Sequence, residues 1–274
     1  MKKTSIVIVA TLLIVASLAL CLSGCGGTSG KTPDEIKEAG VLIIATNAEF
    51  EPFEYTAEDG SYIGWDMDIA RAFADLLGVK IDIRHMQFDS VLAAVASGTA
   101  DIGMAGISYS EKRDETVDFS KGVFNSSQMI IVKSDNTDIQ DAFDLEGKIV
   151  GAQRGTVGAD LAELDPDWAS DGEGGFILGR PASVDKQESG FLAVQNLIQG
   201  KSDAVILDKM PAEAIVAKMG GAVKILEKSV FDDEYAFAVA EGNAELQAWI
   251  NEAIDTLKAN GTWDKITEKY FGEA

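Results

Sequence analysis

Arg113 is one of only five arginines in this chain, and it lies in an acidic stretch, 106–120 (GISYSEKRDETVDFS). One interpretation is a surface ion pair with Glu111, Asp114 or Glu115, which would contribute about 0–1 kcal/mol. The other is that its planar guanidinium binds a carboxylate that is not part of the chain, through two parallel hydrogen bonds. The residue types by themselves leave both interpretations open.

Two further segments carry polar groups where a predicted strand or turn meets a helix. The loop 154–158 (RGTVG) places Thr156 where a glycine turn enters a helix. Backbone N–H groups can hold an anion there, although a simple tight turn has the same pattern. Asp208 ends the apolar run 204–207 just before Pro211, where an acid can cap the next helix, pair with a cation, or do both.

The remaining composition excludes several classes of function. With 45 acidic and 23 basic residues and a net charge of −22, we expect no nucleic-acid partner, because phosphate binding needs a basic face. The only histidine, His85, and the only cysteines, Cys21 and Cys25, cannot form a Ser-His or Cys-His pair or a zinc centre in the body of the chain. We therefore predict no enzyme, no metal and no cofactor, with His85 as a structural residue.

The N-terminus has the pattern of a secretory signal. Two lysines are followed by an apolar stretch over 5–20 and by small residues before Cys25. This segment resembles the bacterial lipobox, in which the cysteine receives a lipid, although an uncleaved membrane anchor has a similar composition. We expect a lipoprotein signal peptide over 1–24, lipid attachment at Cys25 and a flexible tether over 25–37.

The body of the chain alternates short apolar runs with helical patterns. Up to residue 104, we predict strands at 41–45, 79–83 and 102–104 and helices at 66–77 and 90–97. Such alternation indicates an α/β fold with a mostly parallel sheet flanked by helices.

A short pattern occurs twice. Residues 91–101 and 193–203 each read as a helix, a glycine stop, two residues and then an aspartate before an apolar strand. This indicates two similar α/β units, although common α/β patterns would also explain it. The strand-like runs 127–132 and 235–239 would cross between the units, and two helices over 244–271 would pack back on the first.

An ordered set of motifs over nearly all of the mature chain resembles the extracytoplasmic solute-binding proteins of family 3, the amino-acid-binding proteins of ABC importers. The motifs are 45–53 (ATNAEFEPF), 64–70 (GWDMDIA), 105–120 (AGISYSEKRDETVDFS) and 260–271 (NGTWDKITEKYF). The resemblance implies a two-lobed periplasmic-binding-protein-like fold, joined by two hinge strands that close around a ligand. Lobe 1 would comprise 38–127 and 236–274, and lobe 2 would comprise 128–235.

The resemblance also implies a set of ligand-binding residues. Arg113 would bind the ligand carboxylate, Asp208 its ammonium group, and Phe50 and Phe88 would enclose its aliphatic stem, although bare aromatic residues are more often part of a core. The charges beside Phe50 favour a loop there. The full expected set is Asn47, Phe50, Phe88, Ala105, Gly106, Ser108, Arg113, Gln153, Thr156 and Asp208.

The resemblance implies a function as well. We expect a monomer, held on the outer face of the bacterial cell membrane by its lipid, which binds a free polar L-amino acid and delivers it to the membrane subunits of an ABC importer. Asn47, where relatives for basic ligands often carry an acid, favours a neutral ligand, while Glu49 and Glu51 leave a cationic ligand open. The alternative is a dehydratase-like enzyme for small acids on the same scaffold, with Glu49 or Glu51 as general acid. A sensory domain and a surface adhesin are weaker alternatives.

Overall fold

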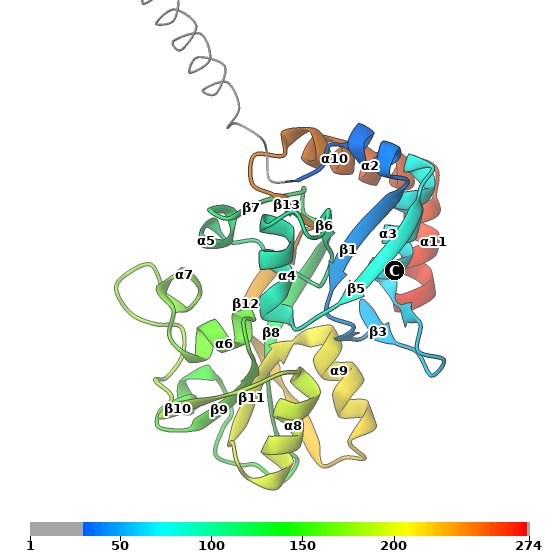
Figure 1. Cartoon of the computed structure of the whole chain (residues 1–274). Helices are drawn as coiled ribbons and strands as arrows, with labels where there is room; N and C mark the ends of the chain where they lie inside the picture. The colour runs from blue at the N-terminus through cyan, green and yellow to red at the C-terminus, as the bar shows by residue number, and fades with distance from the viewer. Residues whose placement is uncertain (1–29, 273–274) are drawn as a thin grey trace, which may run out of the picture.

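The computed structural model describes residues 30–272, which form two lobes of α/β structure (Figure 1). The expected signal peptide over 1–24 and the lipid-bearing Cys25 lie outside the described residues. In the upper lobe of Figure 1, the five-stranded sheet has the order β5 (Lys80–His85), β1 (Val41–Thr46), β6 (Ile102–Gly103), β13 (Ala238–Ala240) and β7 (Val117–Phe119). In the lower lobe, the order is β10 (Ser183–Gln187), β9 (Ile149–Gln153), β11 (Ala204–Asp208), β8 (Phe124–Lys133) and β12 (Val223–Tyr235).

Both sheets are mostly parallel, as expected, and share one departure. In each, the fourth strand, β13 or β8, runs antiparallel to both neighbours. A three-stranded sheet, β2 (Glu49–Phe50), β3 (Glu54–Thr56) and β4 (Tyr62–Ile63), projects from the first lobe. Thus Phe50 lies in a short strand, where the sequence favoured a loop.

Helices flank each sheet. Those of the first lobe are α2 (Pro33–Ala39), α3 (Trp65–Leu77), α4 (Phe88–Ala96), α5 (Glu111–Asp114), α10 (Ala244–Ala259) and α11 (Thr262–Phe271). Those of the second lobe are the 3₁₀ helix η1 (Ala142–Leu145), α6 (Val157–Ala162), α7 (Pro166–Ala169), α8 (Gly190–Gln199) and α9 (Lys209–Lys218). None of the helices within residues 30–272 has the length and apolar character needed to cross a membrane.

Helix α3 shows how the local sequence determines an element. Its buried face repeats at helical spacing, from Met67 through Ala70 and Phe73 to Leu77. Gly78 ends it in the left-handed conformation, φ 73°, and its N–H donates to carbonyls of the last turn.

The predicted tether over 25–37 is wrong in its second half. Helix α2 begins at Pro33, after Thr32, whose side chain and backbone form a reciprocal capping box with Glu35. Ile36 of this helix is fully buried in the core of the first lobe. Because α2 is both capped and packed, any tether must end before Thr32.

The repeated Gly-x-x-Asp pattern corresponds to equivalent positions in the two lobes. Asp101 precedes β6 and accepts a hydrogen bond from the backbone N–H of Ile43 on β1, at 2.8 Å. Asp203 precedes β11 and accepts from the N–H of Ile149 on β9, also at 2.8 Å. Each aspartate thus fixes the third strand of its sheet to the second.

Strands β8 and β12 connect the lobes as one antiparallel ribbon. Their register runs from Lys133 opposite Val223 to Phe124 opposite Tyr235. The predicted strand over 235–239 is interrupted, because β12 ends at Tyr235 and β13 begins at Ala238. The largest core cluster of each lobe differs in kind: that of the first contains aromatic rings that meet mostly edge to face or tilted around Trp65 and Phe53, whereas that of the second is mainly aliphatic.

Candidate functional site

A small cavity of about 10 Å³, room for roughly one water molecule, lies between the two lobes. Its lining comes from strands, loops and the first turns of helices of both lobes: Phe50, Phe88, Gly106, Ser108, Arg113, Thr156, Val157 and Asp208. Seven of these eight residues belong to the set expected from the sequence. The cavity thus brings together most of the residues that the resemblance implied.

Arg113 lies on the short helix α5 and points to the opposite lobe. Its guanidinium donates to the backbone oxygen of Ser108 at 2.7 Å and to that of Gly155 in the second lobe at 3.1 Å. No ion pair joins it to a carboxylate within the described part of the chain, so the interpretation as a surface ion pair is wrong. Burial lowers its pKa, while Asp160, Asp208 and Asp233 act in the opposite direction.

Two aromatic rings lie beside the guanidinium. Its central carbon is 5.5 Å from the ring centre of Trp168 and 6.0 Å from that of Phe88. Phe50, only 6% exposed, belongs to the core of the first lobe and also lines the cavity. Gly106 leaves room for that ring, because a Cβ at its φ of 55° would lie 2.4 Å from Phe50.

Asp208 lies at the other end of the cavity, directly before α9. Its side chain makes no capping hydrogen bond to that helix. Instead its Oδ1 accepts from the Nε2 of Gln128 and from the hydroxyl of Tyr235, both at 2.7 Å. Burial, reinforced by the charge of Asp233, raises the pKa of Asp208 to about 7. The sequence analysis assigned Asp208 two roles, capping of the next helix and pairing with a cation. Because the capping hydrogen bond is not formed, the second role remains.

Asp233 on β12 is a second acid beside Asp208, and the sequence analysis did not select it. Its Oδ2 accepts from the hydroxyl of Ser108 at 2.7 Å and from the Nε2 of Gln128 at 3.2 Å. Burial raises its pKa, against the opposing effect of these hydrogen bonds and of Arg113.

The other expected residues surround this cavity. Asn47 and Gln153 form a buried hydrogen bond between the lobes, at 2.9 Å, and Asn47 also donates to the backbone oxygen of Met86. The hydroxyl of Thr156 donates to the backbone oxygen of Gln153 at 2.8 Å. Ala105 packs its side chain into a hydrophobic cluster, and neither it nor Asn47 nor Gln153 lines the cavity.

A further pair of buried acids lies behind the cavity. Asp66 accepts from the backbone N–H of Gly106 at 3.4 Å, and its pKa is raised by burial to about 7. Glu54 is fully buried, and neither of its oxygens has a hydrogen-bond partner among the described residues. Its pKa lies well above the usual range because of burial and the neighbouring Asp66.

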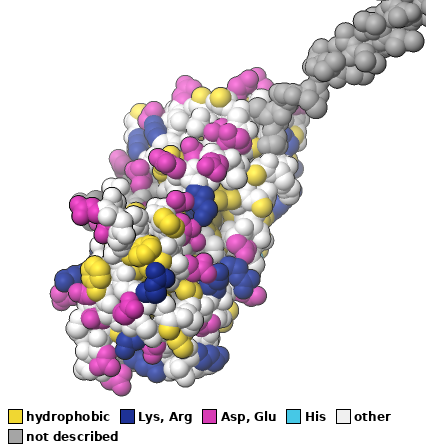
Figure 2. Space-filling model, turned by 90° about the vertical axis from the view of Figure 1, so that its left-hand side faces the viewer, with side chains coloured by type: hydrophobic (Ala, Val, Ile, Leu, Met, Phe, Trp, Pro, Cys, Tyr) yellow, Lys and Arg dark blue, Asp and Glu magenta, His cyan; other side chains and the backbone are white. Residues whose placement is uncertain are grey.

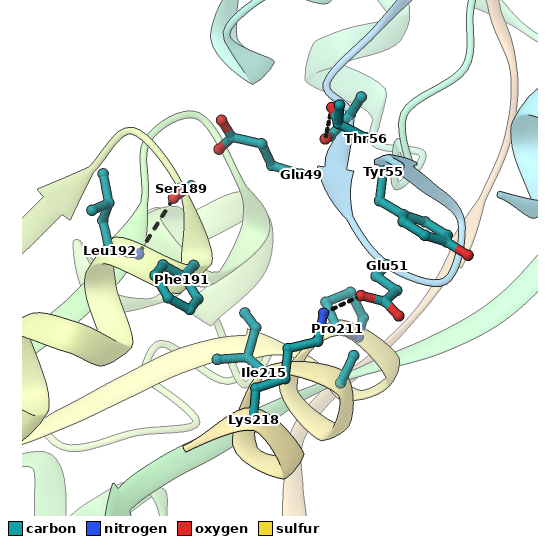
Figure 3. Close-up of a pocket in the computed structure, with 12 residues that line it drawn as sticks. Glu49, Glu51, Tyr55, Thr56, Ser189, Phe191, Leu192, Pro211, Ile215 and Lys218 are labelled. Carbon is teal, nitrogen blue, oxygen red and sulfur yellow. Dashed lines mark hydrogen bonds and ion pairs between the residues drawn. The ribbon is translucent and has the colours of Figure 1, made fainter. Parts of the chain in front are cut away.

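The residues considered for other chemistry lie elsewhere. Glu49 and Glu51 line a second, larger space between the β2–β3 hairpin and helices α8 and α9 (Figure 3). His85, at the end of β5, accepts the backbone N–H of Ala48 through Nδ1 at 3.0 Å, a structural contact as expected. Within residues 30–272, no cluster of three or more His, Cys, Asp and Glu side chains could hold a metal ion.

Five residues at or beside the site were missed: Gln128, Val157, Trp168, Asp233 and Tyr235. Gln128 carried little signal, because it directly follows the polar residues Asn125, Ser126 and Ser127 of the same strand. Asp233 lies in the run Asp232-Asp233-Glu234, which has the composition of a solvated surface. Nothing in the local sequence distinguishes it from its two acidic neighbours.

Comparison with known proteins agrees with this geometry. The sequence profile of the bacterial extracellular solute-binding proteins, family 3, matches residues 42–273. The probable amino-acid-binding protein YxeM of Bacillus subtilis (strain 168) is 30% identical over 267 residues, which cover 96% of this chain and 95% of that protein.

Solved structures give the same result. An ancestral arginine-binding protein bound to glutamine is 37% identical with a TM-score of 0.75, covering 85% of this chain and 99% of that one. The ancestral amino acid-binding protein AncCDT-1, a precursor of cyclohexadienyl dehydratase, is 32% identical with a TM-score of 0.74, covering 87% and 99%. These relatives are named as binding proteins rather than as enzymes.

Proposed function

The chain belongs to family 3 of the bacterial extracellular solute-binding proteins, and we propose that it binds one free polar L-amino acid in the cavity between its lobes. In this proposal the lobes open about the β8–β12 ribbon, admit the ligand and close around it. The 10 Å³ cavity is then the closed form of a larger cleft.

One observation carries the proposal: a partly buried arginine and a buried aspartate line the same cavity, and neither is paired with the other. Arg113 contacts only backbone oxygens and aromatic rings, and Asp208 contacts only neutral donors. Buried charges are unfavourable unless they are paired. An amino acid supplies both missing partners, a carboxylate for Arg113 and an ammonium group for Asp208.

We further propose that the ligand is neutral rather than basic. Asn47, at the position where relatives for basic ligands often carry an acid, is an uncharged amide whose hydrogen bonds go to Met86 and Gln153. Glu49 and Glu51 line the separate groove, so they add no negative charge to the cavity lining.

The cellular role follows from the family and from the N-terminal sequence. We propose that the protein is attached outside the cytoplasm through a lipid on Cys25 and delivers its amino acid to the membrane subunits of an ABC importer. Mass spectrometry of the N-terminal peptide tests the lipid. A peptide with unmodified Cys25 would contradict it.

Thermal unfolding of the full chain in mild detergent tests the binding. The protein is first unfolded and refolded to remove bound ligand, then heated with each of the 20 common L-amino acids and with small cyclic carboxylic acids. At about 100 times its dissociation constant, a true ligand should stabilise the fold by roughly 2.7 kcal/mol. We expect a neutral polar amino acid such as L-glutamine to do so, and to remain unchanged for hours. No shift with any amino acid, or conversion of an added acid, would instead favour the enzyme.

A further inference from the structure

We propose that Asp233 forms, together with Asp208, a two-carboxylate subsite that holds the ammonium group of the bound amino acid. This inference rests on the proposed function, and it assigns a ligand contact to a residue that neither the motifs nor the relatives indicate. Its basis is the arrangement of hydrogen-bond donors and acceptors around Gln128.

Gln128 connects the two carboxylates. This residue of β8 is fully buried, and its Nε2 donates to Asp208 at 2.7 Å and to Asp233 at 3.2 Å. An amide nitrogen has two hydrogens, so both are used. The two acids therefore flank the same amide, one from β11 and one from β12.

The other local donors are also used. The hydroxyl of Tyr235 donates to Asp208 and accepts from Ser126 at 2.8 Å. The hydroxyl of Ser108 donates to Asp233. These contacts leave no side-chain hydrogen of Gln128, Tyr235 or Ser108 for a further acceptor.

Acceptors remain without partners. The Oδ1 of Asp233 and the Oε1 of Gln128 are buried, and neither has a hydrogen-bond partner among residues 30–272. Such atoms are unfavourable unless a ligand or water supplies a hydrogen. An ammonium group brings three donors. In this proposal it donates to the two unpartnered oxygens and to Asp208. Asp208 lines the cavity, and Asp233 lies directly behind Ser108, which lines it as well.

The charges agree with this arrangement. Two carboxylates at one buried site repel each other, so a cation placed between them is stabilised by both. The other charged groups that act on them are Arg113 on α5 and Asp232 on β12 for Asp233, with Glu54 on β3 close to Asp208, while Asp160 on α6 acts on Arg113. Arg113 is the only cation of this group, and its guanidinium donates to Ser108 and Gly155 rather than to either acid.

A purely structural role for Asp233 is the rival explanation, because β12 forms part of the hinge ribbon. In that role Asp233 would hold Ser108 next to the isolated bridge between Ser108 and Tyr235. The two roles differ in what the loss of the charge does. If Asp233 is structural, its substitution should lower the affinity for every ligand and the stability of the ligand-free fold. If it contacts the ammonium group, its substitution should lower the affinity only for ligands that carry that group.

The test compares Asp233→Asn with wild type by calorimetric titration of the full chain in mild detergent. The two probes are L-glutamine and 4-carbamoylbutanoic acid, which has the same skeleton without the ammonium group. L-Arginine and 5-guanidinopentanoic acid form the second pair if wild type prefers arginine. Asp232→Asn, an exposed neighbour on the same strand, is the matched control.

We expect Asp233→Asn to weaken L-glutamine at least tenfold and 4-carbamoylbutanoic acid less than twofold. Its ligand-free Tm should equal or exceed that of wild type, since a repulsion is removed, and Asp232→Asn should change neither affinity. Equal losses for both probes, or an unchanged affinity for L-glutamine, would overturn the proposal. A wild type that binds no amino acid would instead refute the proposed function.

The pH profile supplies a second measurement if the analogue binds too weakly to titrate. Wild-type affinity for L-glutamine should increase from pH 6 to pH 8, as Asp208 loses its proton. In Asp233→Asn the charge of Asp233 no longer reinforces the effect of burial, so the pKa of Asp208 should fall and the increase in affinity should be smaller and lie at lower pH. An identical pH profile in the two proteins would also overturn the proposal.

Discussion

Two of the spaces between the lobes differ in nearly every property. The cavity at Arg113 and Asp208 has a volume of about 10 Å³, whereas the groove between the β2–β3 hairpin and helices α8 and α9 has about 520 Å³. In the groove, Lys218 pairs with Glu51 across the lobes, and Phe191 and Leu192 are 40% and 38% exposed (Figure 3).

The difference shows that volume is a poor guide to the ligand site in this protein. Charged groups in the groove are solvated or already paired, as are many on the outer face, where acidic and basic side chains are interspersed (Figure 2). At the cavity, Asp208 is buried and Arg113 is partly buried, and neither forms an ion pair with another of the described residues. A ligand that pairs with the charged groups of the cavity therefore gains binding free energy there, whereas the charged groups of the groove offer no such gain.

Arg113→Ala should have the largest effect. Loss of one partner of a buried charge pair is worth about 3–5 kcal/mol, so the affinity for L-glutamine should fall roughly a thousandfold. Calorimetric titration measures this, and circular dichroism should show an intact fold. Arg113→Lys, which keeps the charge but loses the planar fork, should give a smaller loss. Nanomolar binding by Arg113→Ala would remove Arg113 from the site.

Asp208→Asn and Phe88→Ala should rank next, in that order. A hydrogen bond to a charged group is worth about 1.5–3 kcal/mol, so Asp208→Asn should weaken L-glutamine by roughly 10- to 100-fold. Phe88 contributes a ring beside Arg113, worth about 0.5–1 kcal/mol, so its loss should cost about fivefold. Titrations of both variants decide the order. A larger loss in Phe88→Ala would place the ammonium group elsewhere.

The ligand-free fold should become less stable as the pH rises. The pKa values of Asp66 and Asp208 are about 7, above the ordinary range for aspartate, so the folded chain binds more protons than the unfolded chain between about pH 4 and pH 7. Stability must therefore fall with rising pH across this window, and we expect a Tm about 5 °C higher at pH 5 than at pH 8. Differential scanning calorimetry measures it, and Asp66→Asn should flatten the curve. A Tm that increases with pH would contradict the assignment.

Lys218→Ala should have the smallest effect. Its pair with Glu51 is half exposed, and such pairs contribute about 0–1 kcal/mol, so the affinity for L-glutamine should change about twofold or less. The same titration measures it, with Lys228→Ala on the second lobe as a control. A tenfold loss would make the groove part of the ligand site and remove the contrast between the two spaces.

The sequence predicted well wherever a local pattern was sufficient. Apolar periodicity identified helix α3 and its glycine stop, and the repeated Gly-x-x-Asp pattern identified the paired units of the two lobes. It failed where distant contacts decide. Residues 33–37 of α2 were assigned to a tether, because the packing of Ile36 into the core cannot be read from its neighbours in the chain.

The sequence by itself determined the α/β class, the two-unit organisation, the family and most of the side chains around the cavity. Only the tertiary structure decided which charges lack partners. Asp233 and Asp232 are adjacent acids in one strand, yet the first faces Gln128 and Asp208 while the second is exposed. Successive side chains of a strand point to opposite faces, so only one of the two can face the interior. Because β8 and β12 cross between the lobes, Asp233 loses contact with water there, and its pKa rises.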